Sequence, residues 1–314
     1  MSGLRLFLSK VKMQSIEHIL FAVNPAAGEG RTGKKGDSAS KDFGDCGLFI
    51  SKNPGEIAEF LTGNADKYDL VVAVGGDGTV NECVNGIIKS GNIETMLFNL
   101  PSGIGNDYAL NLGISEKPAK IKKYCENLRE EKNMLRVKEL DVWQIDEKYF
   151  INYASAGFCA KTLNERNKAN FLNGKAKFFF VALMNYLTYK PIEAEIKINE
   201  KKIKSRIFSM IISNGKYFGG GMKMAPEARM DDGILDISII KPAAFCDYVN
   251  IWLNSYKEDR TETKNMHFCK SDSVNIKSSE MMPLQIDGEY LGEKKEINIV
   301  KAKEKIKVLV PQKF

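Results

Sequence analysis

The stretch that decides the fold is Asp69 to Glu82, which reads DLVVAVGGDGTVNE. Its first six residues are mostly β-branched and aliphatic, which is typical of a strand buried on both faces of a parallel sheet. Glycines and an aspartate follow, and then Thr79 with Glu82 three positions later, which is the spacing of a capping box. The stretch therefore predicts a strand, a glycine turn and a helix that begins at about Val80.

The glycine turn has the composition of a phosphate site. Gly75, Gly76 and Gly78 carry no Cβ, so an anion can approach the backbone N–H groups at the positive end of the helix dipole. Asp77 among these donors opposes a bare phosphate but suits a site that a divalent cation, a hydroxyl or a ribose completes. The alternative is a tight turn in which Asp77 is only a cap. Three glycines are more than such a turn needs, which favours a binding site.

Composition indicates a globular protein of two domains. The chain has 314 residues, of which 43% are hydrophobic. Six cysteines without CxxC spacing are expected to be reduced thiols of a cytoplasmic protein. The two histidines are far apart in sequence, which argues against a His/Cys zinc site and a Ser/His/Asp triad. The longest apolar run, residues 178–184, is about a third of a bilayer crossing.

The excess of positive charge lies in the second part of the chain. Residues 1–137 carry 17 basic and 17 acidic side chains, whereas residues 138–314 carry 29 and 23, for a net charge of +6. This distribution fits a peripheral protein that faces anionic lipid, and it equally fits a solvated lysine-rich surface. We expect no nucleic-acid partner, and a homodimer is compatible with the sequence.

Two further glycine loops follow predicted strands. The first strand, Ile16 to Val23, leads into a loop with glycines and basic residues from Asn24 to Lys35. Another strand, Thr95 to Leu100, ends in the loop PSGIGND, residues 101–107. In a doubly wound sheet the carboxyl ends of neighbouring strands share one crevice, so we expect these loops to lie beside the Gly75 turn.

Beyond about residue 138 short β-type runs dominate, and they predict a second domain that is a β-sandwich or a meander. We place the first domain at 15–137 and the second at 138–302, with a last strand at 303–314 that could return to the first. Residues 178–189, FFFVALMNYLTY, predict a helix packed on the sheet or an aromatic surface that touches lipid. The expected strands are residues 141–145, 149–156, 192–198, 203–213, 235–241, 274–276, 284–286 and 305–310.

Two segments of the second domain carry acidic turns. Residues 211–236 contain a glycine run, a proline and the sequence DDG, and residues 284–290 read LQIDGEY. Taken alone, the first is a DDG turn and the second a hairpin turn.

The run GGDGTVNECVNGI, residues 75–87, resembles the nucleotide-binding signature of the diacylglycerol kinase and sphingosine kinase superfamily, whose distant relatives include NAD kinase and phosphofructokinase. The Asn24 loop, the Pro101 loop, the DG turn and the DGE segment extend the resemblance over nearly the whole chain. It implies an α/β fold, with an N-terminal doubly wound, Rossmann-like nucleotide domain and a C-terminal β-sandwich domain. Two departures are Ile104, where relatives carry threonine, and Gly36 to Gly47, which lacks the expected amphipathic helix.

Carried over by position, the resemblance also implies the site. Magnesium would be shared through Asp77 and Asp107, and Glu289 would accept the proton of the substrate hydroxyl. A further magnesium would bind the Asp232 side chain and the main-chain oxygens of Arg229 and Ile234. The nucleotide would contact Asn24, Gly28, Lys34, Ser51, Gly75, Gly76, Asp77, Gly78, Thr79, Asn81, Ser102 and Ile104.

These features together predict an ATP-dependent lipid kinase that uses Mg²⁺, with diacylglycerol as the expected acceptor. Such a protein would be cytoplasmic and peripheral to the inner face of the membrane. One alternative is a kinase of a soluble acceptor such as NAD, which the DG and DGE segments disfavour. Another is a nucleotide- or lipid-binding regulator without catalysis, which the two departures favour.

Overall fold

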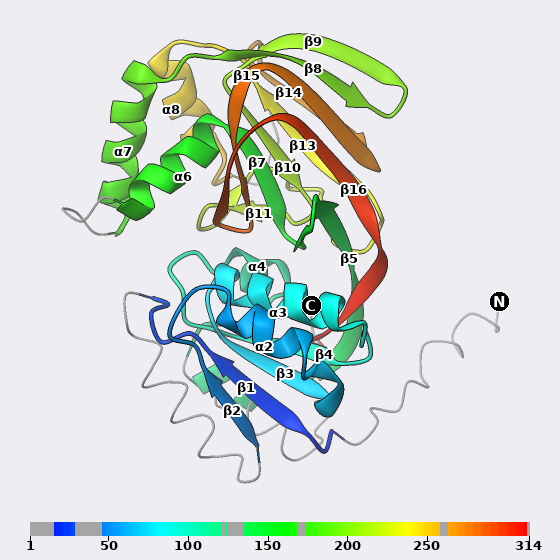
Figure 1. The fold of residues 1–314 in the computed structure, drawn as a ribbon. Coiled ribbons are helices and arrows are strands. Elements are labelled where there is room, and N and C mark those ends of the chain that lie inside the picture. Colours follow the sequence, from blue (N-terminus) through cyan, green and yellow to red (C-terminus); the bar gives the residue numbers. More distant parts are fainter. Residues whose placement is uncertain are drawn as a thin grey trace, which may run out of the picture.

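The protein folds into two lobes, one stacked above the other (Figure 1). The structure, a computed structural model, describes residues 16–28, 46–117, 119–120, 123–124, 135–168, 174–257 and 263–312. Residues 29–45, which include Lys34, lie outside the described residues. Residues 119–130 have the composition of a helix with lysines on one side, but most of them also lie outside the described residues.

The first lobe is built on a parallel sheet in the order β2-β1-β3-β4-β16. The sheet order reverses between β1 and β3, and ligands of doubly wound sheets bind at the carboxyl ends beside such a reversal. The Asn24 loop and the Gly75 turn follow these two strands. The strands are β1 (Ile19–Val23), β2 (Gly47–Ile50), β3 (Leu70–Gly75) and β4 (Met96–Pro101).

Helices α2 (Glu56–Thr62), α3 (Asp77–Ser90) and α4 (Asp107–Asn111) accompany this sheet, with a short 3-10 helix at Ala65–Lys67. Figure 1 shows α3 and α4 on the side of the first lobe that faces the second.

The capping box predicted at the start of α3 is wrong. The helix begins at Asp77 with Gly76 as its N-cap, so Thr79 lies inside the first turn. The Glu82 carboxylate instead accepts a hydrogen bond of 3.2 Å from the N–H of Ile57, at the start of α2. Because the helix begins three residues earlier than predicted, Thr79 cannot be its N-cap, and Glu82 is free to cap the neighbouring helix.

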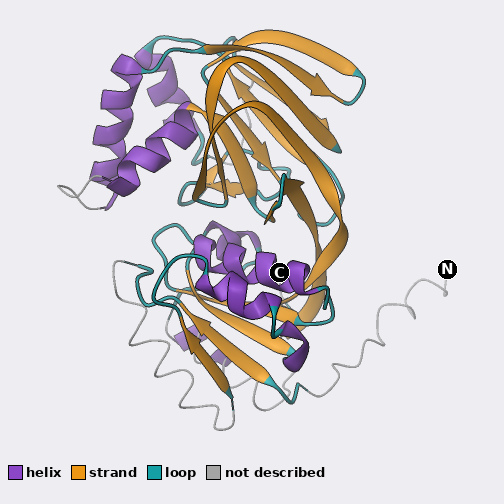
Figure 2. Ribbon diagram, viewed as in Figure 1, coloured by secondary structure: helices purple, strands orange, loops and turns teal. Residues whose placement is uncertain are grey.

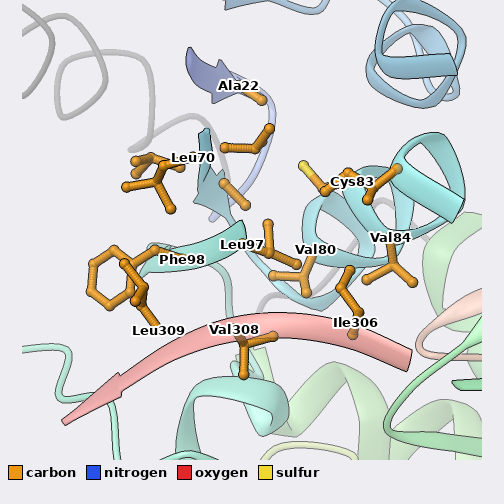
Figure 3. Close-up of a cluster of buried hydrophobic side chains, with 14 of the residues drawn as sticks. Ala22, Leu70, Val80, Cys83, Val84, Leu97, Phe98, Ile306, Val308 and Leu309 are labelled. Carbon is orange, nitrogen blue, oxygen red and sulfur yellow. The ribbon is translucent and has the colours of Figure 1, made fainter. Parts of the chain in front are cut away.

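The core of the first lobe is apolar and lies between α3 and the sheet. Val80, Cys83 and Val84 of α3 belong to one cluster with Leu97 of β4 and with Ile306 and Val308 of β16 (Glu289–Pro311), the last strand of the chain (Figure 3). All are nearly inaccessible to solvent, which accounts for the unbroken apolar runs in the sequence.

The second lobe is a curved, mostly antiparallel sheet with its helices on one side (Figure 2). Its main path is β14-β13-β10-β7-β15-β16, and the β8–β9 hairpin joins through β15. The strands are β6 (Lys148–Phe150), β7 (Tyr153–Gly157), β8 (Ile192–Ile198), β9 (Lys201–Ile207), β10 (Ser209–Ser213), β11 (Tyr217–Phe218), β12 (Met222–Lys223), β13 (Leu235–Ile240), β14 (Met266–Ser271) and β15 (Ser273–Ile286).

Two long strands connect the lobes. Strand β16 (Glu289–Pro311) pairs with β15 in the second lobe and with β4 in the first, and β5 (Leu135–Ile145) runs antiparallel beside it. Their register shifts between Lys301 and Lys305, where a β-bulge bends the ribbon. The two lobes therefore share a continuous two-stranded connection.

The helices of the second lobe are α6 (Phe158–Lys168), α7 (Gly174–Thr188) and α8 (Phe245–Asn254). The helix predicted at 178–189 is confirmed as part of α7, whereas α6 and α8 were not predicted. Among the described residues, no helix is both long enough and apolar enough to cross a bilayer.

The strand predicted at 149–156 is in fact two strands, β6 and β7. Residues 151 and 152 bend between them because their N–H groups turn to the buried carboxylate of Asp287 rather than to a neighbouring strand. The run at 203–213 likewise divides into β9 and β10, which pair with different neighbours.

Candidate active site

The three loops predicted to share a crevice do meet at the carboxyl ends of β1, β3 and β4. Asn24 donates its N–H to the Val74 carbonyl at 3.2 Å, and Ser102 donates its N–H to the Gly75 carbonyl at 3.0 Å. A Cβ on Gly103 would lie 2.5 Å from the Cα of Gly76, so the two glycine turns touch backbone to backbone. Only glycines permit this approach.

The remaining loop residues support the same crevice. The Asn24 side chain accepts from the N–H of Ala26 at 3.0 Å, and Gly28 has a positive φ of 61°. Ser51 is buried at the end of β2 and donates its N–H to the Val23 carbonyl at 3.0 Å. Ile104 is 52% exposed, so the side chain that replaces threonine projects from the loop. The nucleotide contacts of these residues stay predictions.

Thr79 lies directly beneath the first glycine of the motif. A Cβ on Gly75 would lie 2.1 Å from the Thr79 Oγ1, so this position requires glycine for space. The Thr79 hydroxyl is buried and has no hydrogen-bond partner among the described residues. Because this hydroxyl is enclosed by protein, the nucleotide contact of Thr79 stays a prediction.

Asp77, which is half-buried, and Asp107, which is buried, form a pair of carboxylates. Both carboxylates lie near Gly105. A Cβ on that glycine would be 3.2 Å from the Asp77 Oδ2 and 3.8 Å from the Asp107 Oδ2. Asp77 accepts the N–H of Tyr108 at 2.8 Å. Burial raises the pKa of Asp77, and burial together with the Asp77 charge raises the pKa of Asp107 to about 7. Two adjacent carboxylates favour a bound cation, which would relieve their repulsion.

Asp107 is held by the second lobe. The turn between β11 and β12 consists of Gly219, Gly220 and Gly221, which all have positive φ. The N–H of Gly220 lies 3.0 Å from both oxygens of Asp107, and the N–H of Gly221 lies 2.8 Å from its Oδ1. We call residues 219–221 the tri-glycine turn.

A cavity of about 260 Å³ opens between the lobes at this acid pair. The first lobe contributes Asp77, Gly78 and Asp107 to its wall, and the second contributes Asp287 and Gly288. Arg166 of α6 is the single basic side chain in this wall among the described residues. The sequence motifs therefore converge on one cleft, although they are separated by up to about two hundred positions in the chain.

The DGE segment is a hairpin turn and also part of the site. Asp287 and Gly288 both have positive φ, 42° and 90°, as a two-residue turn between β15 and β16 requires. The Asp287 carboxylate accepts four hydrogen bonds, from the N–H groups of residues 151–153 and from the Asn81 side chain. Burial raises the pKa of Asp287 to about 6, against these bonds. Asp287 therefore ties the hairpin to α3.

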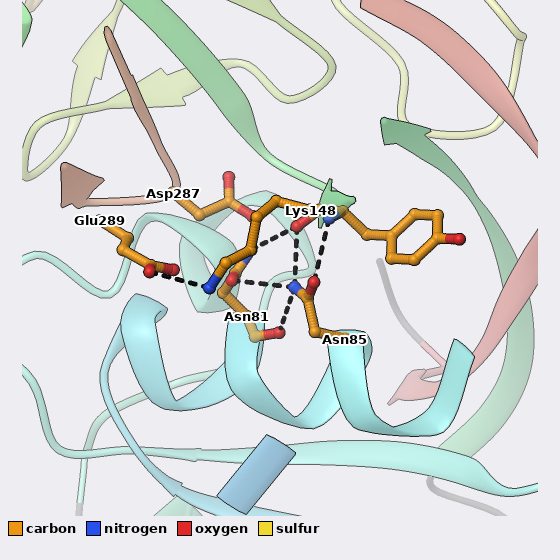
Figure 4. Close-up of polar contacts among 6 residues, drawn as sticks. Asn81, Asn85, Lys148, Asp287 and Glu289 are labelled. Atoms are coloured by element: carbon orange, nitrogen blue, oxygen red, sulfur yellow. Dashed lines mark hydrogen bonds and ion pairs between the residues drawn. The ribbon is translucent and has the colours of Figure 1, made fainter. Parts of the chain in front are cut away.

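Glu289 lies just beyond this turn, at the interface with α3. Its carboxylate pairs with the Lys148 ammonium at 3.0 Å and is 42% exposed (Figure 4). Asn81 and Asn85 of α3 both donate to the Tyr149 carbonyl at 2.9 Å. The two lobes are thus joined by direct polar contacts beside the cavity. Glu289 follows Gly288 of the cavity wall but does not itself line the wall, and its role stays a prediction.

The DDG turn is rich in ion pairs. Asp231 pairs with Lys138 at 3.3 Å and with Arg229 at 3.6 Å. The Asp232 Oδ1 accepts the N–H of Ile234 at 3.0 Å. Among the described residues there is no group of three or more His, Cys, Asp or Glu that could hold a metal ion. The magnesium site at Arg229, Asp232 and Ile234 stays a prediction.

A second, apolar cavity of about 130 Å³ adjoins the first. It lies between α6, α7 and α8 and the sheet, and aromatic side chains such as Tyr186, Phe208 and Tyr248 line it. Cys159, Phe218, Met222 and Trp252 belong to the walls of both cavities. The polar cleft and the apolar chamber are therefore neighbours that share part of one wall.

Comparison with known proteins agrees with this architecture. Residues 18–140 match the diacylglycerol kinase catalytic domain, and residues 152–308 match the YegS C-terminal NAD kinase beta sandwich-like domain. The protein named "Probable lipid kinase YegS-like" of Shewanella frigidimarina (strain NCIMB 400) is 30% identical over 255 residues, 78% of each chain. The chain belongs to the diacylglycerol kinase-like family of lipid kinases. By this assignment it is an ATP-dependent kinase, and the resemblance drawn from its motifs is confirmed.

Other members and more distant folds extend the comparison. The diacylglycerol kinase of Bacillus subtilis (strain 168) is 28% identical over 229 residues, 72% of this chain and 73% of that protein. The crystal structure of a diacylglycerol kinase from Bacillus anthracis str. Sterne has a TM-score of 0.72 at 21% identity and covers 96% of this chain and 99% of its own. An NAD kinase from Archaeoglobus fulgidus in complex with ATP has a TM-score of 0.51 at 13% identity, over 95% of both chains. The predicted fold class is confirmed.

Proposed function

We propose that this family member transfers the γ-phosphate of ATP to the hydroxyl of a lipid, with diacylglycerol as the first acceptor to test. The observation that carries the proposal is that the two cavities lie side by side with a common wall. Glycine turns and an acid pair lie at one of them, and the other is an apolar chamber. A soluble polar acceptor would gain little from that chamber, whereas an acyl chain would be removed from water there.

The first lobe supplies the phosphate end. The Gly75 and Pro101 turns would hold the triphosphate against their N–H groups, as glycine turns at helix N-termini do. The acid pair fits Mg²⁺, because two adjacent carboxylates whose charges repel match a hard divalent ion that would take its other ligands from phosphate and water. Magnesium there would neutralise charge on the transferred group. Arg166 would add positive charge from the second lobe.

The second lobe supplies the acceptor end. The oxygen of the lipid hydroxyl forms a bond to the γ-phosphorus while the bond between that phosphorus and the β,γ-bridging oxygen of ATP breaks. The hydroxyl proton passes to Glu289, and ADP leaves. Because the transition state is loose, the proton leaves late and a carboxylate needs mainly to orient the hydroxyl.

Helix α7 offers a route from a membrane. Phe180, Met184 and Leu187 are 42%, 48% and 69% exposed, and their spacing places them on one face of the helix. Leu183 and Tyr186 of the same helix line the apolar chamber. We infer that the exposed face of α7 rests on the lipid surface while the chamber behind it receives the chain.

The test is phosphate transfer from labelled ATP to a panel of lipid alcohols in mixed micelles, with NAD as the soluble acceptor. Transfer to diacylglycerol, or to another lipid of the panel, supports a lipid kinase. Transfer to NAD without micelles would overturn the lipid acceptor. ATP binding without transfer to any acceptor would instead favour a regulator that has lost catalysis.

A further inference from the structure

We propose that the tri-glycine turn of the second lobe is a positioning element for Asp107, which completes the acid pair when the two lobes are in contact. The inference rests on the proposed phosphoryl transfer, and it adds a specific way in which the second lobe controls the chemistry of the first.

The two members of the acid pair obtain their hydrogen bonds from different lobes. Asp77 is held within the first lobe, by the N–H of Tyr108. Asp107 receives the N–H groups of Gly220 and Gly221, which lie 113 and 114 positions later in the chain. If the turn were withdrawn, Asp107 would keep the repulsion of Asp77 without these donors. This repulsion would then favour rotation of the Asp107 carboxylate away from Asp77.

The turn has the backbone that this task needs. Gly219, Gly220 and Gly221 have φ of 59°, 90° and 97°, values that residues with a Cβ rarely adopt. Successive residues of this kind can direct neighbouring N–H groups at one anion. Here the anion is a side chain of the other lobe, and it is almost completely buried.

Helix α4 is held to the same hairpin at its other end. The Asn111 Oδ1 accepts the N–H of Lys216 at 2.7 Å and that of Tyr217 at 3.3 Å. The Asn111 Nδ2 donates to the Asp107 carbonyl at 2.9 Å and to the Asn152 Oδ1 at 2.6 Å. The single turn of helix that carries Asp107 is therefore fixed to the second lobe at both its first and its last residue. A passive surface loop would not require two such attachments.

The experiment replaces Gly220 or Gly221 by alanine, with Gly292→Ala as the matched control. Gly292 has φ of 89°, against 90° at Gly220, and an added Cβ would meet no close atom at either position, the nearest being the Gly105 Cα at 3.9 Å from Gly220, so the backbone strain is similar. We expect Gly220→Ala and Gly221→Ala to lower kcat about tenfold or more, since a Cβ at these positive φ values strains the turn and displaces N–H groups that donate to a charged carboxylate, with the KM for ATP within about threefold. Gly292→Ala should keep kcat within about twofold of wild type, and melting temperatures report folding of all three.

A double-mutant cycle separates positioning from a merely structural role. The labelled assay can follow the low residual transfer of an Asp107→Asn variant. In that background Gly220→Ala should lower kcat by a further factor of less than about three, because both changes act through one carboxylate. The inference is overturned if the glycine variants match Gly292→Ala in kcat, or if Gly220→Ala costs the same factor in both backgrounds. Failure of the proposed function itself would appear differently, as a wild-type protein without transfer to any acceptor.

Discussion

At the residue scale, Asp287 and Glu289 flank one glycine and have different surroundings. Asp287 is 2% exposed, and each of its two carboxylate oxygens accepts two hydrogen bonds. It therefore has no lone pair left to receive a substrate proton. Glu289 has one ammonium partner and partial access to solvent. The hairpin thus uses its first acid to hold the lobes together and leaves its second acid for chemistry.

We predict that Glu289→Gln lowers kcat by about 10²–10⁴, the range for loss of a positioned general base, with little change in the melting temperature. The Lys148 pair is partly exposed, so its loss contributes little to stability. The measurement is transfer to diacylglycerol in micelles, and Glu293→Gln, an exposed acid of the same strand, is the control. Equal rates for the two variants would exclude Glu289 as the proton acceptor.

Residue types within contiguous motifs could be predicted from the sequence because local geometry determines them. Gly75, Asp77 and the hairpin at Asp287 follow from turn and strand-end chemistry within a few positions. The binding of Asp107 by the tri-glycine turn could not be predicted in this way. It joins residues more than a hundred positions apart, and only the register of β10 and β13, which fixes the hairpin, decides what the turn meets. The position of Arg166 in the cavity wall could not be predicted either, because no sequence motif surrounds this residue.

At the scale of elements, helix α7 has two apolar faces with separate functions, one toward the chamber and one toward solvent. The sequence predicted this helix from its apolar run but left open whether it packs or touches lipid. The helix does pack against the second lobe, whereas contact of its outer face with lipid stays a proposal. Helix α8 was missed because aromatic and β-branched residues in FCDYVNIWLN favour a strand locally, and packing over the sheet decides otherwise.

We predict that Met184→Glu with Leu187→Glu weakens binding to anionic vesicles about tenfold or more, since each change removes roughly 1–2 kcal/mol of apolar transfer free energy and adds a repelled charge. Leu48→Glu is the control, because Leu48 is 46% exposed on β2 of the first lobe. Sedimentation with vesicles measures binding. Unchanged sedimentation of the double variant would exclude α7 as the lipid-facing element.

At the scale of the whole molecule, an ion cluster fastens the ribbon that connects the lobes. Asp141 of β5 is fully buried and pairs with Lys301 at 2.8 Å and with Lys305 at 3.1 Å, the residues on either side of the bulge in β16. Its carboxylate also accepts the N–H of Gly233 at 2.6 Å, from the DDG turn. Burial alone would raise the pKa of Asp141. The two ammonium groups and the Gly233 N–H outweigh burial, so the pKa lies below its usual range.

We predict that Asp141→Asn lowers the free energy of unfolding at pH 7 by about 2–3 kcal/mol, as expected for hydrogen bonds to a charged group. Because the folded pKa is lowered, this contribution is present above the unfolded pKa of 3.8 and is lost as pH falls through the folded pKa. The difference between wild type and variant should therefore shrink toward pH 3 in urea unfolding. Asp146→Asn, whose carboxylate is 58% exposed in its pair with Lys294, should change stability little. A pH-independent difference would contradict this role of Asp141.

We propose that the cleft between the lobes transfers phosphate from ATP to a lipid hydroxyl and that this transfer depends on the acid pair. The most direct measurement is labelled phosphate transfer to diacylglycerol in mixed micelles by the wild type and by Asp77→Asn, with ATP binding measured in parallel. We predict transfer by the wild type and a loss of about a hundredfold or more in the variant, with ATP still bound, because charge stabilisation provides most of the rate in phosphoryl transfer. Transfer by Asp77→Asn within about threefold of wild type would contradict the account.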